Sequence, residues 1–540
     1  MKTFTLLIAM VLLTHFGLFA QSSNNVYSST SVKTGETRMS VSSGAVLTVT
    51  GTLTIDPGGK LIVNPGGGLT VSEALINNSI ATDLVIESGG SLITEGSVSG
   101  QAIIKRTITA NLGWHMLSSP VSYQEICDGT FAPILANFST TPSTSFDFYK
   151  WNENELCIPF CWRNLRSTDL SANTIDFGSP PQFVVKSGYL VAYSSYFPSY
   201  KIFTGTPNTG DQTFSLTIRP SSSLLNWNLI GNPYPSAVDW DNVTGKSNLV
   251  NGYYYVYNIN KIGGAGYEGY LDATHKTSGV SGKIPAMQAF FVNALGTSIG
   301  IPNLARTHES DNWLKSAESI TPDKLTFTLS NATNYDEAYV LFESNGKIGS
   351  DWYDATKMLS LDLQIPQIYT MASVDQKTLI NSMPYINNPI TIPVGIVAPA
   401  DGNYSIKVTG IENVTSLTGL SLEDLTLHHT QNLLQNPVYH FTASGNEDAS
   451  RFLLHFNGDI TNSDNNPIKI YSSEKTISVF CFTGLQNGQI TVSNMIGQQI
   501  LIQKMIDQPL NQVRINAVKG YYIVKVRSDN AVKTAKVYIN

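Results

Sequence analysis

The sequence predicts an all-β protein that is divided into several folding units. Short segments in which apolar and polar residues alternate recur along most of the chain, whereas the 3.6-residue spacing of an amphipathic helix is almost absent. Glycine, asparagine and proline stand between these segments and predict turns. A chain of 540 residues exceeds what one hydrophobic core can organise, so we expect roughly three or four units.

The composition favours an extracellular β-protein. Hydrophobic residues make up 42% of the chain, which is enough for globular cores and excludes wholesale disorder. Charged residues make up only 14%, and serine, threonine, asparagine and glycine take their place. The net charge of −7 and the lack of a lysine or arginine cluster exclude nucleic acid as an expected partner.

Residues 1–20 predict a secretory signal peptide. The first two residues supply a small positive region, and residues 4–19 are mostly apolar. We expect cleavage between Ala20 and Gln21, directly after a small residue. The alternative, a membrane anchor, needs about 20 apolar residues, and this stretch is interrupted before that length. Because no later stretch is long enough either, we expect no transmembrane segment in the mature chain.

Residues 25–108 contain a glycine-rich repeat that predicts a short β-helix-like solenoid. Each repeating segment joins a glycine-bearing turn to a short strand, at 56–63, 64–71 and 87–94. Glycine accepts the positive φ that such turns require. One segment cannot bury its apolar face alone, so the segments must stack. The pattern resembles the opening segments of many surface-exported bacterial proteins.

Residues 109–320 predict a duplicated β-rich domain. Residues 113–121 and 226–235 each hold a tryptophan-led strand that ends at a proline-bearing turn. An apolar strand comes after each of them, at 188–193 and at 289–292. We therefore expect two related halves. The paired pattern resembles a module of secreted proteins from bacteria with type IX secretion.

Residues 321–458 predict a β-sandwich, and residues 459–466 predict a linker. Strands such as 325–329, 338–342 and 404–408 alternate cleanly and are separated by asparagine- and glycine-bearing turns. The linker is polar and rich in turn-forming residues. Its aspartates lack the spacing of an EF-hand, so we predict no calcium site there.

Residues 467–540 predict an immunoglobulin-like sandwich. About seven short strands fit a domain of this size. Asn487 and Gly488 signal a two-residue hairpin turn, and residues 533–539 form the closing strand.

The same segment resembles the type A C-terminal sorting domain of the type IX secretion system. Three motif elements stand in the order of that family, and their residues are Asn494, Gly497, Gly520, Tyr522, Val524, Val526, Lys533, Lys536 and Val537. The resemblance implies a Gram-negative source, passage through the periplasm and recognition by the type IX secretion translocon. It further implies removal of the domain, followed by release or by attachment to surface lipopolysaccharide. The alternative is a plain terminal sandwich domain without an address function.

No segment predicts a catalytic, cofactor-binding or metal-binding site. Residues 296–300 match the Gly-x-Ser-x-Gly pattern of a nucleophile elbow, but a proline follows where that motif needs a helix. Residues 263–266 are glycine-rich, yet they lack the lysine and the helix of a phosphate-binding loop. The histidines lack the spacing of a zinc protease. We therefore expect that the protein is not an enzyme and needs no cofactor.

The four cysteines allow local disulfides at most. In an oxidising compartment Cys157 can pair with Cys161 or with Cys127, and the sequence leaves this choice open. Cys481 lies in an alternating strand, which favours a buried, small apolar residue over a reactive thiol.

Two aromatic segments are candidates for glycan contact. Tyr255 and Tyr257 stand in a tyrosine-rich strand, while Trp352 and Tyr353 are flanked by aspartates. Flat aromatic rings stack on sugar rings, and neighbouring acids can bond to sugar hydroxyl groups. The competing interpretation is structural, since tyrosine and tryptophan are common strand residues whose polar ends reach water.

Together these patterns predict a secreted or outer-surface protein of adhesin-like or structural type. Its expected partners are the translocon, surface lipopolysaccharide, and a glycan or another host or matrix ligand. The alternative is a secreted carbohydrate-active hydrolase, or a carbohydrate-binding protein. The hydrolase would have a site in 109–320 that sequence patterns miss.

Overall fold

The computed structural model describes residues 19–21, 25–32, 38–108, 113–138, 140–142, 144–154, 161–165, 177–219, 226–259, 261, 263–310, 323–373, 376–386, 389–445, 447–457, 468–473, 475–481, 488–505, 510–528 and 531–539. The predicted linker 459–466 and Cys157 lie outside these residues. The chain divides into two units. The first is Met1–Leu249 with Gly282–Asn312, and the second is Val250–Ser281 with Trp313–Asn540.

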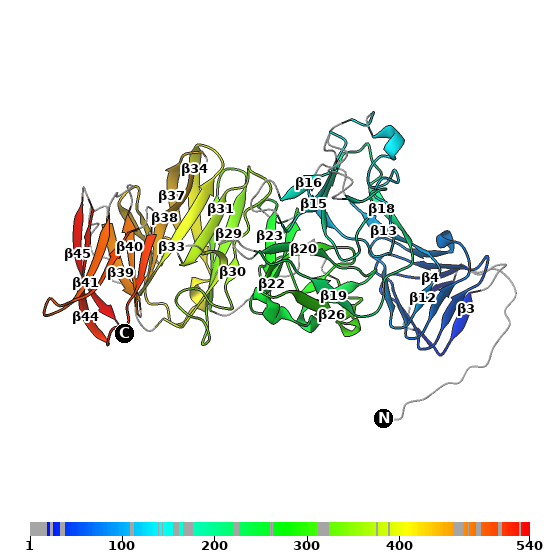
Figure 1. Cartoon of the computed structure of the whole chain (residues 1–540), viewed down its shortest axis with the longest axis horizontal. Helices are drawn as coiled ribbons and strands as arrows, with labels where there is room; N and C mark the ends of the chain where they lie inside the picture. The colour runs from blue at the N-terminus through cyan, green and yellow to red at the C-terminus, as the bar shows by residue number, and fades with distance from the viewer. Residues whose placement is uncertain are drawn as a thin grey trace, which may run out of the picture. The chain divides into compact units, whose positions relative to one another are not determined.

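Parallel strands stacked into three sheets form a solenoid at the start of the first unit (Figure 1). The first sheet holds β1 (Phe19–Gln21), β4 (Arg38–Val41), β7 (Lys60–Val63), β10 (Leu84–Ile86) and β13 (Ala102–Thr107), the second β2 (Asn25–Tyr27), β5 (Val46–Val49), β8 (Gly68–Val71) and β11 (Ser91–Thr94), and the third β3 (Thr30–Val32), β6 (Leu53–Ile55), β9 (Leu75–Asn77) and β12 (Val98–Ser99). The solenoid prediction is therefore confirmed. Segments 64–71 and 87–94 stack on each other, whereas 56–63 contributes to a different side of the coil.

Alternating apolar side chains fill the core of the solenoid. Leu47 pairs with Leu69, and Leu69 pairs with Leu92, so that three fully buried leucines form one column. The turns need glycine for two separate reasons. Gly89 has a φ of +84°, and a Cβ on Gly90 would lie 2.8 Å from the carbonyl oxygen of Val63. Both positions therefore resist substitution.

The two tryptophan-led strands of the first unit pair with the apolar strands expected after them. β14 (His115–Leu117) is antiparallel to β17 (Tyr189–Tyr193), and β20 (Trp227–Gly231) is antiparallel to β25 (Ala289–Ala294). The unit also contains β15 (Phe146–Trp151), β16 (Trp162–Asn164), β18 (Tyr200–Gly205), β19 (Gln212–Ser215), β21 (Ala237–Asp239), β24 (Lys283–Ile284), β26 (Ser298–Ile301) and β27 (Arg306–Thr307). Strand β18 pairs with β13 and so extends the first solenoid sheet.

His308 joins the solenoid to the segment that follows β27. Its Nε2 lies 2.8 Å from the Thr70 hydroxyl, and its Nδ1 lies 2.7 Å from the Ser91 hydroxyl. Burial lowers the pKa of His308 to about 4, so the ring is neutral at physiological pH. The ring occupies the space above Gly68, where a Cβ would lie 2.9 Å from it. A glycine in the second sheet therefore makes room for this contact.

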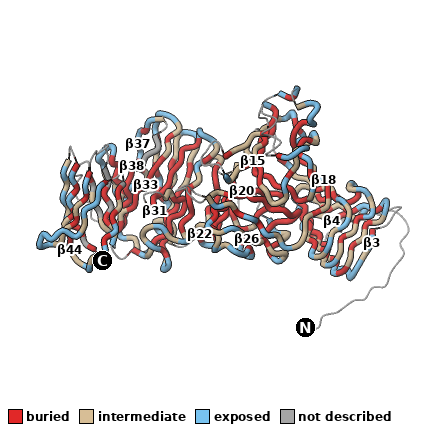
Figure 2. Tube along the Cα trace, in the orientation of Figure 1, coloured by how far each residue is buried: buried red, intermediate tan, exposed pale blue. Residues whose placement is uncertain are grey.

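A sheet that folds over one core forms the sandwich of the second unit. Its strands run in the order β36 (His429–Asn432), β35 (Leu420–Asp424), β38 (Glu447–Phe456), β33 (Ile390–Ala398), β31 (Gln367–Ser373), β32 (Gln376–Met383), β29 (Tyr335–Phe342), β28 (Lys324–Ser330), β34 (Gly402–Thr409) and β37 (Val438–Ala443), and β30 (Ala355–Thr356) also pairs with β32. One hydrophobic cluster includes Phe327 of β28, Ile392 of β33 and Phe452 of β38. Figure 2 shows the buried positions along β31, β33 and β38.

The same unit contains a tyrosine-rich hairpin and a second sandwich. The hairpin consists of β22 (Leu249–Asn258) and β23 (Gly266–Tyr270). The second sandwich places β39 (Ile468–Ser473), β40 (Thr476–Cys481) and β43 (Leu510–Arg514) in one sheet, and β42 (Gln499–Lys504), β41 (Gln489–Asn494), β44 (Gly520–Arg527) and β45 (Val532–Ile539) in the other. Both sheets contribute to one core.

Helical segments with assigned bounds are short 3₁₀ turns. They are η1 (Ala81–Asp83), η2 (Leu135–Asn137), η3 (Trp240–Asn242), η4 (Lys246–Asn248), η5 (Asn303–Ala305) and η6 (Ile411–Asn413). Within the part of the chain that the structure describes, no helix has the length and apolar character needed to cross a membrane. The all-β fold class predicted from the sequence is confirmed.

Candidate functional sites

The first part of the predicted sorting motif forms a tight turn between β41 and β42. The side-chain oxygen of Asn494 accepts hydrogen bonds from the backbone N–H groups of Ile496 (3.2 Å) and Gln498 (2.9 Å). Gly497 has a φ of +85°, which glycine adopts at low cost. The turn leaves Met495 56% exposed and Ile496 80% exposed. Asn494 and Gly497 therefore shape a turn whose tip is apolar.

The other motif residues divide between the core and the surface of the second sandwich. The core members are Tyr522, Val524 and Val526 of β44 and Val537 of β45. Gly520 begins β44, Lys533 is partly buried in β45, and Lys536 is exposed there.

Two of these motif positions make specific contacts. The Tyr522 hydroxyl donates to the carbonyl oxygen of Val518 at 2.6 Å. The Lys536 ammonium lies 4.0 Å from the centre of the Tyr521 ring. Met495 and Ile496 stand inside the first motif element but, like Tyr521, were not among the predicted motif residues.

Tyr255 and Tyr257, the first predicted pair of glycan contacts, are buried in β22. Tyr255 is 1% exposed and Tyr257 is 4% exposed. The Tyr255 hydroxyl accepts a hydrogen bond from the backbone N–H of Thr356 at 2.8 Å, and the Tyr257 hydroxyl lies 3.3 Å from that of Ser360. The expectation that these rings face solvent is therefore corrected. The segment after Trp352 covers this strand, because Tyr353, Thr356 and Ser360 contact its tyrosine hydroxyl groups.

Trp352 and Tyr353, the second predicted pair, lie at the surface of the second unit. Trp352 is 39% exposed, and its ring packs on the backbone of Gly252, where a Cβ would lie 2.7 Å from it. The ring of Tyr353 stacks on that of His275 with a centroid distance of 4.7 Å. We call Trp352, Tyr353, His275, Asp272 and Asp351 the aromatic–acid patch.

His275 is held between two carboxylates. Its Nδ1 lies 2.9 Å from Asp272, its Nε2 lies 2.8 Å from Glu343, and the Ser382 hydroxyl donates to the same Glu343 oxygen. Burial alone would lower the pKa of His275, but hydrogen bonds and charge from Asp272 and Glu343 raise it. In a serine–histidine–acid triad, one ring nitrogen faces the hydroxyl. Here the Glu343 carboxylate lies between the His275 ring and the Ser382 hydroxyl, so His275, Asp272 and Glu343 form an ion-pair network.

Asp354 anchors the turn that carries Trp352. One of its oxygens accepts from the backbone N–H of Ser382 and the other from that of Asp351, both at 2.9 Å. Burial raises the pKa of Asp354 to about 8, and the nearby Asp351 adds to the effect. The carboxyl group is fully buried. Its role is therefore to position the exposed aromatic residue.

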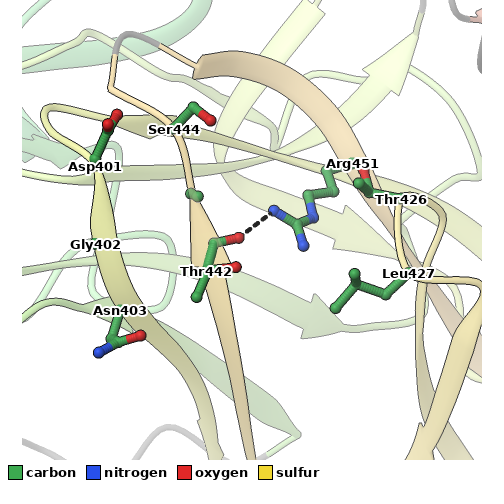
Figure 3. Close-up of a pocket in the computed structure, with 9 residues that line it drawn as sticks. Asp401, Gly402, Asn403, Thr426, Leu427, Thr442, Ser444 and Arg451 are labelled. Atoms are coloured by element: carbon green, nitrogen blue, oxygen red, sulfur yellow. Dashed lines mark hydrogen bonds between the residues drawn. The ribbon is translucent and has the colours of Figure 1, made fainter.

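A pocket of about 430 Å³ lies at the ends of β34 and β37 (Figure 3). Its lining residues are Asp401, Gly402, Asn403, Thr426, Leu427, Thr442, Ala443, Ser444 and Arg451. Two nitrogens of Arg451 lie 3.0 and 2.8 Å from the oxygens of Asp424, and a third donates to the Thr442 carbonyl at 2.7 Å. The guanidinium is thus held by the protein. The pocket offers mainly amide, hydroxyl and carboxylate groups.

Other residues singled out from the sequence occupy structural positions. Ser298, at the centre of the elbow-like pattern, lies in β26, which is antiparallel to β19. Cys127 and Cys161 are both buried, and burial raises the pKa of the Cys127 thiol to about 12. Ala20 and Gln21 lie in β1, which is parallel to β4.

Residues 23–456 match a protein family described as a domain of unknown function, DUF8693. The chain is also 22% identical over 371 residues to the minor fimbrium subunit Mfa5 of Porphyromonas gingivalis. That match covers 63% of this chain and 29% of the relative, so the chain spans less than a third of the relative's length.

A solved structure titled "Biofilm associated protein - BSP domain" aligns with 79% of this chain and 59% of its own. It does so at 9% identity with a TM-score of 0.17, which is too low to support an argument from it.

Proposed function

We infer a function for this chain from the premise that it belongs to the DUF8693 family and is distantly similar to a fimbrial subunit. The proposed role is that of a non-enzymatic structural or adhesin-like protein, secreted or held at the cell surface. The similarity to the minor fimbrium subunit is the observation that carries this proposal. The His275 network supports it, because its charged groups are paired with one another.

The proposal includes export by the type IX secretion system, with residues 467–540 as the sorting signal. The Asn494–Gly497 turn supports this assignment, since it displays Met495 and Ile496 to solvent. Exposed apolar residues on a rigid turn are suited to recognition by another protein. Under this proposal the translocon binds the module, and surface lipopolysaccharide is the site of attachment for chains that are not released. The domain limits predicted from the sequence form part of the same proposal.

Deleting residues 467–540 tests the export proposal. We expect the truncated chain to accumulate in the periplasm, while the full chain reaches the surface or the medium. Among the described residues, the sandwich strands of the body pair with one another and not with strands of the deleted segment, so the body should keep its fold. Cell fractionation with immunodetection gives the measurement. Undiminished surface delivery of the truncated chain would contradict the proposal.

Glycan binding at the aromatic–acid patch is a second candidate function. The exposure of Trp352 favours it, and the adjacent Tyr353 contacts Asp351 directly and Asp272 through the stacked ring of His275. A sugar ring can stack on the indole, while the neighbouring carboxylates accept hydrogen bonds from its hydroxyl groups.

A Trp352→Ala variant tests this second candidate on a glycan array. We expect about tenfold weaker binding, equivalent to about 1.4 kcal/mol, because the stacking surface is removed. Trp352→Phe keeps a ring at the same place and should retain most of the binding. Equal binding by wild type and Trp352→Ala would remove the patch from consideration.

A further inference from the structure

A carboxylate and two lysines meet inside the second unit. Asp336 lies near the start of β29, and its Oδ1 is 3.0 Å from the Lys261 ammonium. Its Oδ2 contacts the Lys357 ammonium directly and also accepts the backbone N–H of Ile368 at 2.9 Å. The side chains of Asp336 and Lys357 are 4% and 2% exposed. The Lys357 amine is therefore held against a carboxyl group out of contact with water.

Burial makes the charged forms of this pair costly. Moving an ammonium and a carboxylate out of water carries a large desolvation cost, which transfer of a proton from one to the other removes. Burial lowers the pKa of Lys357, although Asp336 opposes the effect, while the charges of Lys357 and Lys261 lower the pKa of Asp336 against the effect of burial. For Lys261 burial acts in the same direction, but the charges of Asp336, Glu268 and Glu337 prevail and raise its pKa. Lys357 is thus the more easily deprotonated amine.

Glu268 supplies a second buried acid beside Lys261. It lies in β23 and is 1% exposed, and its Oε2 has no hydrogen-bond partner among the residues that the structure describes. Burial raises its pKa, which the charge of Lys261 partly offsets. If Asp336 were no longer a carboxylate, Glu268 would remain as the counter-charge for Lys261. The buried charges would then balance without Asp336.

We propose that Lys357 and Asp336 condense to an intramolecular isopeptide bond in the folded chain. The Lys357 ammonium first passes a proton to the Asp336 carboxylate, which leaves a neutral amine and a neutral acid. The amine nitrogen attacks Cγ, a C–N bond forms, and a C–O bond breaks as one water molecule leaves. An ammonium and a carboxylate thereby become an amide and water. Atoms and charge balance, and the step needs no oxidant or co-reactant.

The bond would link parts of the sandwich that are otherwise joined by hydrogen bonds. Asp336 and Lys357 are 21 positions apart. Asp336 lies on β29, and Lys357 follows β30, which pairs with β32. The link would therefore close a covalent ring across the sheet and resist separation of these strands by force. This inference does not depend on the export route or on glycan binding.

Peptide mass spectrometry of the denatured full-length protein tests the inference. Cleavage after lysine and arginine should release residues 325–347 joined to residues 348–377, at the sum of their masses less one water. Lys357→Arg keeps a positive charge beside Asp336 but cannot form this amide, so it should yield three separate linear peptides, 325–347, 348–357 and 358–377. Lys261→Arg is the matched control and should keep the joined peptide.

Two results would overturn the inference. Separate, linear peptides from the wild-type protein would show that the pair is an ordinary ion pair. A joined peptide that persists in Lys357→Arg would show that another amine has reacted. The wild-type measurement is decisive even if a variant fails to fold.

Discussion

Both ring nitrogens of His275 bond to carboxylates, so the stability of the folded state depends on the protonation of this ring. The folded state raises the pKa of His275, so its contribution is fully present below the ordinary histidine pKa of about 6.5. That contribution is lost as pH rises through the folded-state value. Asp272 has the opposite pH dependence. Hydrogen bonds from His275 hold its pKa at about 2 against the effect of burial, so its contribution to stability is lost as pH falls toward that value. Asp354 also contributes stability that falls as pH rises, because burial of its carboxyl group raises its pKa to about 8.

We predict that His275→Gln destabilises the protein at mildly acidic pH and has a smaller effect at alkaline pH. The expected loss is about 2 kcal/mol near pH 5.5, the usual magnitude for hydrogen bonds to charged groups. Thermal unfolding of both proteins at about pH 5.5 and about pH 8.5 gives the comparison. A difference in stability that grows toward alkaline pH would refute the ion-paired state of His275.

At the scale of a single element, the Asn494–Gly497 turn contains residues that stabilise the fold and different residues that a partner could contact. Asn494 and Gly497 stabilise the turn, whereas Met495 and Ile496 project from it. Glycines have a similar structural role in the solenoid turns, where they accept a positive φ or a close backbone contact that other residues cannot. Motif residues with structural roles therefore need to be distinguished from those that a partner can touch.

We predict that Met495→Ser combined with Ile496→Ser reduces export without weakening the fold. Both side chains are exposed, so the thermal midpoint should stay within about 2 °C of wild type. The fraction of protein at the surface should fall several-fold. Val518→Ser removes another exposed apolar side chain of the same sandwich and should leave export unchanged. Equal export by the double variant and the control would contradict the role of the turn tip.

Over the whole molecule, the fold class and the solenoid followed from local sequence patterns, and the candidate sites did so only in part. Trp352 was identified as a candidate contact and is exposed in the structure. Tyr255 and Tyr257 were proposed by the same criterion and are buried. The difference arises because the tyrosine-rich sequence of β22 does not reveal that residues 353–360 cover this strand.

The sequence by itself determined where strands and turns form, because alternation, glycine and proline act on the backbone within a few residues. Only the tertiary structure decided which polar groups meet. His275 contacts Glu343 across 68 positions, and Lys261 contacts Asp336 across 75. Such contacts depend on how distant strands pack, and no local pattern encodes them. For the same reason, the proposed bond between Lys357 and Asp336 could be inferred only after the sandwich had brought the two side chains together.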